Sequence, residues 1–410
     1  MIEFKNISLQ LGKRTIFNDV NLKFESGNCY GIIGGNGGGK TTLLRLILGE
    51  VEPTEGKIEI SPDEKISCLD RNHYAFSEKT LLDTVTNGSK NPEDIELAKQ
   101  ILIGLGVRDA KHLKLMVEVS PVKQIRTMLA RALFGNPTVL LLDDPTQFLD
   151  IDSARWFENF MLQFKGTAII VSLDRHFLNR VCTHICDVEI GSIELFRGNF
   201  NSWRAGRIVQ ADFKVARPEQ IESDRILLVD NLEKSIDGSP IISKVSFTIK
   251  PGEKVAFVGG IPRRIEMLFQ ILAGEEKIFD SGIVEWDKNA RIAYLPKNYA
   301  QLFDGSNLAP DVRAKEMLKR TMSMHANVLI LHEPTANLDL ESITALNESL
   351  INFNGTILFN SSDREFVQSI ANRIIDLPNE GTIDRISTYS DFLSNESVKS
   401  QLRRKYRKKS

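Results

Sequence analysis

The chain has 410 residues, enough for two or three domains that each bury a hydrophobic core. With 42% hydrophobic residues, 26% charged residues and a formal net charge of −2, it is not a protein that binds nucleic acid through its overall charge. Its four cysteines are too few for a disulfide framework, and no apolar run approaches the roughly 18 residues of a membrane span. The first residues, MIEFKNISLQ, do not resemble a signal peptide, so we expect a cytoplasmic protein.

The chain is a tandem repeat. VLLLDDPTQFLD (139–150) recurs as VLILHEPTANLD (328–339), and the shared prolines give a repeat offset of 189 (334 − 145). The first glycines of the two front loops, Gly34 and Gly259, give a larger offset of 225 (259 − 34). The second copy is therefore shorter between its front and its middle, by the difference of 36 between the two offsets (225 − 189).

The sequences of both copies predict the same order of strands and helices. A strand-rich start leads to a strand, a loop and a helix; after a variable middle come a helix, an apolar strand with an acidic motif, another helix and another strand. Short apolar runs between helices indicate strands that are buried on both faces. We therefore expect an α/β fold of two tandem domains, each a mixed, largely parallel sheet with flanking helices, and with the helical part of the second shortened. The expected segments are a first domain over 1–203, a polar linker over 204–225, a second domain over 226–392 and a basic tail over 393–410.

The strongest motif is GGNGGGKT (34–41), which matches G-x-x-x-x-G-K-[ST] between an apolar strand and a helix. Glycines allow consecutive backbone N–H groups to surround phosphates, and the helix N-terminus favours negative charge. Lys40 is expected to reach the β- and γ-phosphates of ATP, and the Thr41 hydroxyl to bind Mg²⁺. The alternative is a glycine-rich turn with an incidental lysine. The predicted ATP-binding residues are Gly34, Gly35, Asn36, Gly37, Gly38, Gly39, Lys40, Thr41 and Thr42.

An acidic motif follows the next strongly apolar strand, at Asp143-Asp144. An acid at the end of a buried strand beside a phosphate loop is placed to hold Mg²⁺ through water. Asp143 is the expected metal acid, and Asp144 is the candidate to orient or deprotonate the attacking water; the alternative is a turn that caps the strand. Further on, the cysteines and histidine of CTHIC (182–186) have no zinc-site spacing, so we interpret them as part of a partly buried apolar segment.

These motifs, with a strand that ends before Asp174-Arg175, resemble an ATP-binding cassette, which implies two tandem P-loop NTPase domains. Two cassettes in one chain resemble the ABC-F family of ribosome-associated ATPases. The resemblance covers about residues 1–392 and is strongest in GNCYGIIGGNGGGKTTLLRLILGEVEPTEG, ALFGNPTVLLLDDPTQFLD and DRHFLNRVCTHICDVEIGSIELFRGNF of the first copy. It implies ATP and Mg as cofactors, cassettes that pair within the chain, and a ribosome or RNA partner.

The first site departs from the family pattern. The signature expected opposite its loop, usually close to L-S-G-G-Q, is Leu308-Ala309-Pro310-Asp311-Val312, which lacks the serine hydroxyl and one N–H and adds an acid. Each lost charge-assisted hydrogen bond is worth about 1.5–3 kcal/mol. Four further family positions are changed: the catalytic glutamate is Asp144, the switch histidine is Leu173, the glutamine is Arg71 and the adenine-stacking aromatic is Leu11. The resemblance therefore implies slow or absent hydrolysis.

The second site departs further. Pro262-Arg263-Arg264-Ile265-Glu266 replaces the glycines, the lysine and the hydroxyl. The Mg-binding acid becomes His332, the switch position Ser362, the glutamine Lys297, and the first copy's own signature is Ser120-Pro121-Val122-Lys123-Gln124. Glu333 alone persists, which we interpret as structural, and HEPTA (332–336) does not match the zinc-protease pattern H-E-x-x-H. We predict that no nucleotide binds here.

The segments outside the sites are short. ABC-F proteins usually join their cassettes by a long helical hairpin, which the short linker cannot build. The end of the tail, VKSQLRRKYRKKS (398–410), carries seven Lys or Arg and no acid. It either contacts RNA phosphates, with Tyr406 stacking on a base, or is a disordered solubilising end. The basic residues expected at RNA are Arg403, Arg404, Lys405, Arg407, Lys408 and Lys409.

We therefore interpret the chain as a degenerate ABC-F-like nucleotide switch or pseudoenzyme, linked to the ribosome, with one ATP site. Three alternatives remain. The first is a working ATPase, for which Asp144 suffices. The second is a transporter's energy module, which the changed glutamine positions and the shortened helical part disfavour. The third is a scaffold that binds no nucleotide, which the lost adenine-stacking aromatic favours and the preserved loop disfavours.

Overall fold

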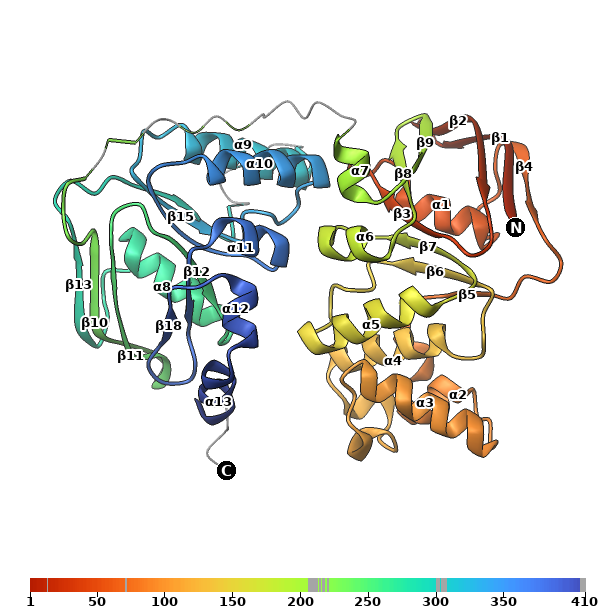
Figure 1. Ribbon diagram of the computed structural model, residues 1–410, viewed down its shortest axis with the longest axis horizontal. Coiled ribbons are helices and arrows are strands. Elements are labelled where there is room, and N and C mark those ends of the chain that lie inside the picture. Colours follow the sequence, from red (N-terminus) through yellow and green to blue (C-terminus); the bar gives the residue numbers. More distant parts are fainter. Residues whose placement is uncertain are drawn as a thin grey trace. The chain divides into compact units, whose positions relative to one another are not determined.

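The computed structural model describes the chain except residues 13, 71, 206–212, 214, 216–217, 220, 300–302, 304–307 and 406–410. It divides into two compact units, Met1–Ile208 and Val209–Ser410, and each unit contains one copy of the repeat (Figure 1). Half of the expected linker, Arg71, and the end of the expected tail lie outside the described residues. No helix in the described part of the chain has the length and apolar character needed to span a bilayer.

The first unit contains two sheets. The three-stranded antiparallel sheet has the order β2-β1-β4, and the six-stranded sheet has the order β5-β6-β7-β3-β8-β9, in which only the β8–β9 pair is antiparallel. The strands are β1 (Ile2–Leu11), β2 (Arg14–Phe24), β3 (Cys29–Ile33), β4 (Glu55–Ile60), β5 (Ile66–Cys68), β6 (Val139–Asp143), β7 (Thr167–Val171), β8 (His184–Glu189) and β9 (Ser192–Arg197).

Burial explains these strands. All five residues of β3 and of β7 are buried, as expected where helices or a second sheet cover both faces of a parallel sheet, whereas burial in β1 varies along the strand because only one face packs inward. The core between the two sheets includes apolar side chains of α1 such as Leu43 and Leu44. The helices of this unit are α1 (Lys40–Ile47), α2 (Leu81–Thr86), α3 (Pro92–Gly104), α4 (Pro121–Leu133), α5 (Ile151–Gln163), α6 (Arg175–Val181) and α7 (Phe200–Ala205).

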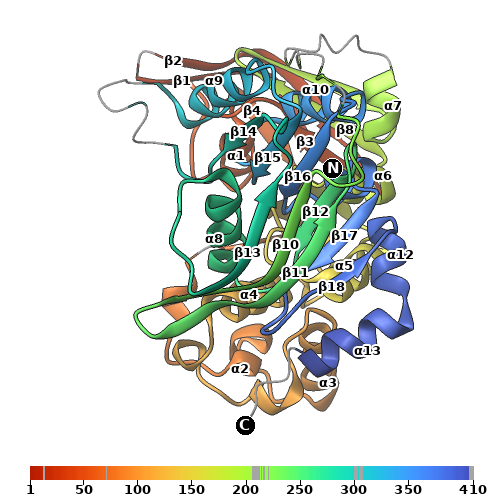
Figure 2. The same ribbon diagram turned by 90° about the vertical axis from the view of Figure 1, so that its left-hand side faces the viewer.

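The second unit repeats this topology. Its sheets have the orders β11-β10-β13 and β14-β15-β16-β12-β17-β18, and Figure 2 shows β10, β11 and β13 side by side as the antiparallel sheet. The strands are β10 (Leu227–Ile236), β11 (Ser239–Ile249), β12 (Lys254–Val258), β13 (Ser281–Trp286), β14 (Ile292–Leu295), β15 (Val328–His332), β16 (Thr356–Asn360), β17 (Arg373–Asp376) and β18 (Ile383–Arg385). The predicted fold of two tandem cassette-like domains is confirmed.

The helical part of the second unit is shorter, as the repeat offsets predict. In the first unit α2, α3 and three short 3₁₀ segments lie between β5 and α4. The described residues between β14 and the next helix include no α-helix. The helices of the second unit are α8 (Pro262–Ala273), α9 (Pro310–Met322), α10 (Leu340–Ile351), α11 (Arg364–Ile370), α12 (Tyr389–Ser394) and α13 (Glu396–Lys405).

The C-terminal segment differs from a separate tail that begins at 393. That position lies within α12, and α13 follows almost directly. Phe392 and Val398 are fully buried in the core of the second unit, and Leu402 packs against it. The apolar residues at these spacings hold the basic helix to the unit, so the described part of the tail is a packed helix and not a disordered end.

Candidate functional site

The predicted phosphate loop spans residues 34–39, between the end of β3 and the start of α1. Gly34 has φ 129° and Gly39 has φ 114°, a region that side chains rarely adopt. A Cβ on Gly34 would lie 2.1 Å from the Val188 carbonyl oxygen, and a Cβ on Gly39 would lie 2.8 Å from Ile16. At Gly35 a Cβ would meet nothing within 4 Å. The loop therefore requires glycine where it touches the protein and has open space elsewhere.

Two cations bind the carbonyl oxygens of this loop. The Lys40 ammonium donates to the carbonyls of Gly34 and Gly35 at 2.8 and 2.9 Å. Arg14, at the start of β2, donates to the Gly37 carbonyl at 2.9 Å. Lys40 therefore lies inside the curve of its own loop, where a positive charge can also reach phosphate oxygens. The sequence motif predicted Lys40 but gave no signal for Arg14.

The two residues predicted to hold Mg²⁺ are in contact. The Thr41 hydroxyl, in the first turn of α1, donates to a carboxylate oxygen of Asp143 at 3.0 Å. Asp143 is the last residue of β6, which is separated from β3 by β7 alone. A hydroxyl and a carboxylate beside a phosphate loop are the hard oxygen ligands that Mg²⁺ prefers. These residues fit Mg-ATP.

The catalytic candidates are placed as follows. Asp144 has φ 53°, and its N–H donates to the Val171 carbonyl at 2.8 Å. This left-handed conformation directs the chain sharply away from the end of β6, beside the loop. Leu173 is half-buried at the switch position and supplies no group that can titrate or donate a hydrogen bond. Leu11, at the adenine position, is 48% exposed at the end of β1.

The second unit has a shorter connection at the equivalent place. Only residues 259–261 separate β12 from α8, whereas residues 34–39 separate β3 from α1. Pro262 starts the helix, because its fixed φ and missing N–H suit the first helical position. Helix replaces the part of the loop that would surround phosphates.

Arg264 occupies this region. Its side chain is 5% exposed and donates to the carbonyls of Ile241 at 2.8 Å, Leu377 at 2.8 Å and Pro378 at 2.5 Å. Leu377 is the counterpart, at the repeat offset of 189 (377 − 188), of Val188, whose carbonyl lies beside the glycines of the first loop. One of the carbonyls that the guanidinium binds is thus the counterpart of the carbonyl that faces the loop in the first unit. The sequence showed that the glycines were lost, but not that an arginine would be buried in their place.

The acids of the second motif are also changed. His332 is 2% exposed, packs edge-on against Phe269 with ring centroids 5.6 Å apart, and burial, with a smaller effect of Lys297, lowers its pKa to about 4. It is therefore neutral near pH 7 and a poor substitute for the carboxylate that Mg²⁺ prefers. The Glu333 carboxylate accepts hydrogen bonds from the Asn360 amide at 3.1 Å and from the backbone N–H and hydroxyl of Ser362 at 3.0 and 3.1 Å.

Both signature positions begin a helix with proline. Ser120 precedes α4 and Ala309 precedes α9, and Pro121 and Pro310 take the first helical positions. Near the first signature, crowding by Lys111 lowers the pKa of Lys123 to about 8. Within the described residues, no group of three or more His, Cys, Asp or Glu side chains is arranged to hold a metal ion.

Comparison with known proteins identifies relatives along almost the whole chain. Residues 17–147 match a family model described as ABC transporter. The chain is 33% identical over 539 residues to the uncharacterized ABC transporter ATP-binding protein YkpA of Bacillus subtilis (strain 168), covering 99% of this chain and 100% of the relative. It is 24% identical over 505 residues to the energy-dependent translational throttle protein EttA of Escherichia coli (strain K12), covering 91% of each chain.

A solved structure has the same overall fold. The complex of an archaeal ribosomal stalk protein with the archaeal ribosome recycling factor aABCE1 contains a chain that matches with a TM-score of 0.66 and 17% identity, covering 96% of this chain and 92% of that chain. The alignment with the Bacillus protein exceeds the length of this chain by 129 positions (539 − 410). At least that many residues of the relative have no counterpart here.

Proposed function

Because the chain belongs to the ABC-F family of twin ATP-binding-cassette proteins, we propose that it is a nucleotide switch that binds one Mg-ATP in its first cassette and hydrolyses it slowly or not at all. The observation that carries this proposal is the contrast between the two loops. The first retains its glycines, Lys40 and the Thr41–Asp143 contact, whereas Arg264 is buried in the second.

In the first cassette, the loop from Gly34 to Thr42 holds the phosphates through backbone N–H groups, and Lys40 binds the β- and γ-phosphates. Thr41 and Asp143 hold Mg²⁺, Asp143 through water. The metal supplies positive charge against the phosphate oxygens. Apart from the metal ion, the groups that orient the nucleotide are the loop N–H groups and the side chains of Lys40, Thr41 and Asp143.

Hydrolysis is slow because the groups that would act on water are short or missing. Asp144 is one methylene shorter than the family's glutamate, and a displacement of about 1 Å can cost on the order of 10² in rate. Leu173 can neither bind the γ-phosphate nor relay a proton. A second candidate, a working ATPase, is favoured by one observation: Asp144 keeps a carboxylate directly after Asp143, which accepts from the Thr41 hydroxyl at 3.0 Å.

The second cassette keeps its fold and binds no nucleotide. Arg264 binds the counterpart of the carbonyl on which the loop glycines pack in the first cassette, and the Glu333 carboxylate is held by Asn360 and Ser362. We extend the proposal to a ribosome- or translation-associated role on the strength of the relative named a translational throttle. The exposed Arg404 of α13 offers positive charge for RNA phosphates, whereas Lys399 of the same helix is paired with Glu396 at 2.7 Å.

The test is a single-turnover reaction with labelled Mg-ATP and protein in excess, read for retained nucleotide and released phosphate. We expect retention of one ATP per chain with almost no release, and no retention in Lys40→Ala. Arg263→Ala, at an exposed position of the second cassette, is the matched control and should retain ATP. Rapid release that disappears in Lys40→Ala would replace the switch by the ATPase, and no retention at all would leave the scaffold. Co-sedimentation with ribosomes, with and without ATP, tests the partner.

A further inference from the structure

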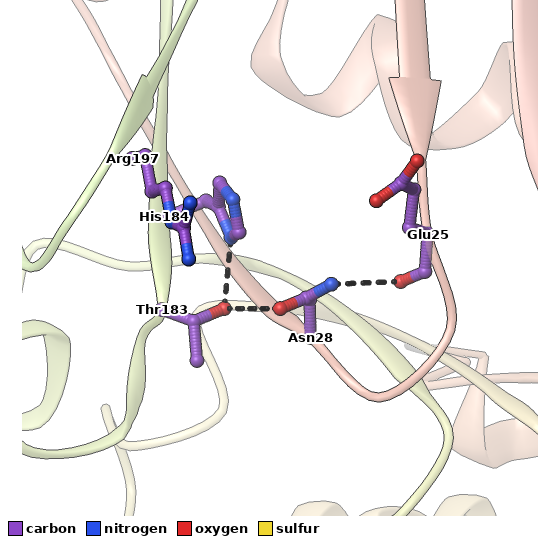
Figure 3. Close-up of a pocket in the computed structure, with 5 residues that line it drawn as sticks. All are labelled: Glu25, Asn28, Thr183, His184 and Arg197. Atoms are coloured by element: carbon purple, nitrogen blue, oxygen red, sulfur yellow. Dashed lines mark hydrogen bonds between the residues drawn. The ribbon is translucent and has the colours of Figure 1, made fainter.

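A pocket of about 370 Å³ lies in the first cassette, at the opposite end of β3 from the phosphate loop. Its lining residues are Glu25, Asn28, Thr183, His184 and Arg197 (Figure 3). Asn28 comes just before β3, His184 is the first residue of β8, and Arg197 is the last residue of the antiparallel strand β9. These positions share the amino-terminal edge of the parallel strands. The phosphate loop lies at their carboxyl-terminal edge, so the pocket is separate from the ATP site.

The pocket has two walls and a floor. His184 and Arg197 are direct partners across β8 and β9 and form one wall, Glu25 forms the opposite wall, and Thr183 and Asn28 lie between them (Figure 3). The Thr183 hydroxyl is 2.9 Å from His184 Nδ1 and 3.2 Å from the Asn28 side-chain oxygen. The His184 ring also stacks on the buried Tyr30, with centroids 4.9 Å apart. These contacts fix the imidazole and do not use its Nε2.

The walls carry opposite charge. Arg197 makes no ion pair with any residue that the structure describes. Glu25 pairs with the exposed Lys23 at 3.2 Å, an arrangement worth little free energy in water. Burial, and then Arg197, lowers the pKa of His184, so this wall has one permanent cation beside a neutral imidazole.

The second cassette closes the equivalent place with its own side chains. Arg373 stands at the position of His184 (373 − 184 = 189), and Glu253 at that of Asn28 (253 − 28 = 225). The Arg373 guanidinium binds Glu253 at 2.6 Å, Asp384 at 2.8 and 2.5 Å, and the Thr248 carbonyl at 2.8 Å. The open pocket, in which Arg197 has no ion-pair partner among the described residues, is therefore a property of the first cassette and not of the shared fold.

We propose that this pocket binds a small zwitterion of the amino-acid type, with its carboxylate between Arg197 and His184 and its ammonium group toward Glu25. A guanidinium binds a carboxylate through two parallel hydrogen bonds, and the imidazole adds a third donor at Nε2 once it is protonated, which an adjacent carboxylate favours. The volume is at the lower end of the range of small-molecule pockets, which begins near ~300 Å³. The inference goes beyond the proposed switch and does not depend on it.

The test observes the histidine side chains by NMR, using protein labelled at its six histidines, with His184 assigned by its absence in His184→Gln. The probes are glycine, β-alanine, acetate and methylammonium. Glycine or β-alanine should shift the His184 signal at millimolar concentration and raise its apparent pKa, since a carboxylate favours the imidazolium. Acetate should bind about tenfold more weakly and methylammonium not at all.

Two substitutions complete the test. Arg197→Ile, which introduces the residue found at the equivalent position 386, and Glu25→Gln should each weaken zwitterion binding about tenfold. Both side chains are exposed, so the variants should fold, as unfolding curves will check. Arg225→Ile, which removes a paired arginine of the second cassette, is the control and should bind as the wild type does. Acetate binding as tight as glycine binding, unchanged binding in Arg197→Ile, or no shift of His184 with either amino acid would each overturn the proposal.

Discussion

Asp150 and Asp174 in the first cassette have counterparts in Asp339 and Asp363 of the second, and all four cap a helix. Each carboxylate accepts the N–H of the residue three positions on, at distances from 2.8 to 3.1 Å. Lys40 and Thr41, by contrast, have Ile265 and Glu266 at their counterparts, at the front-loop offset of 225 (265 − 40). The acids that the two copies share support the backbone. Comparing the copies therefore separates residues that the fold needs from residues that only a ligand needs.

The position after each acidic strand extends this comparison. Asp144 and Glu333 both have left-handed backbone, with φ 53° and 50°. Both N–H groups bind the neighbouring strand, at Val171 and Asn360. The backbone geometry of a catalytic position has persisted in the second cassette although the acid before it has become His332. The backbone geometry at this position is therefore set by the fold, whereas the chemistry depends on the side chain.

The largest predicted effect concerns Lys40, and it tests the contrast between the loops of the two cassettes. Lys40→Ala should weaken ATP binding on the order of 10³-fold, about 4 kcal/mol, because two charge-assisted contacts to phosphate are lost. Equilibrium binding of labelled ATP measures this. Ile265→Ala, at the equivalent position of the second cassette, should leave ATP affinity unchanged, and equal effects of the two variants would mean that both loops bind nucleotide.

Arg264 should show the opposite pattern. Arg264→Ala should lower the free energy of unfolding by about 3 kcal/mol, because three carbonyls lose a buried donor. Urea unfolding measures this, with the exposed Arg263→Ala as control. The stoichiometry of bound ATP should stay at one per chain; a second ATP in Arg264→Ala would show that this side chain alone had blocked the site.

Restoring family residues at the first site should sharpen the contrast. Asp144→Glu together with Leu173→His should raise single-turnover phosphate release about tenfold, since both changes place a group nearer the attacking water. Glu333→Asp in the second cassette is the mirror control and should change nothing in the rate. An unaltered rate in the double variant would place the limit elsewhere, in the substituted signature.

The smallest predicted effect concerns pH. The buried Glu158 raises the pKa of His176, which lies 3.0 Å from it, so protonated His176 stabilises the first cassette. A raised pKa contributes stability below the unfolded value of 6.5 that is lost as pH rises through the folded value. His176→Asn should therefore destabilise by about 0.5 kcal/mol below pH 6.5 after allowance for solvent screening, and less at higher pH. Urea unfolding against pH checks this, with the exposed His325→Asn as control; a pH-independent difference would contradict it.

Much of the fold could be predicted because it repeats. The repeat offset between Pro145 and Pro334 and the strongly apolar strands sufficed for two similar α/β units, and the larger offset between Gly34 and Gly259 sufficed for the shorter second helical part. The polar C-terminal end was harder, because Phe392 and Val398 are few among charged residues, and their burial depends on the rest of the unit.

The site divides in the same way. Lys40 and Thr41 were predicted from the loop motif and Asp143 from the acidic motif, and the structure brings Thr41 and Asp143 into contact. Arg264 and the hydrogen bonds of Glu333 were not found, because they depend on partners far along the chain, such as Leu377, or on another strand, such as Asn360. The pocket at Arg197 combines side chains of separate segments and has no local pattern.

The buried Arg264 also bears on how this protein can change in evolution. Returning Pro262, Arg263 or Glu266 singly to the residues of a phosphate loop would leave the guanidinium and its three carbonyls in place. Removing Arg264 first would leave those carbonyls without a donor and a helix still starting at Pro262. If the second cassette binds no nucleotide, as proposed, then no single substitution would restore a phosphate loop there, and several changes would have to occur together.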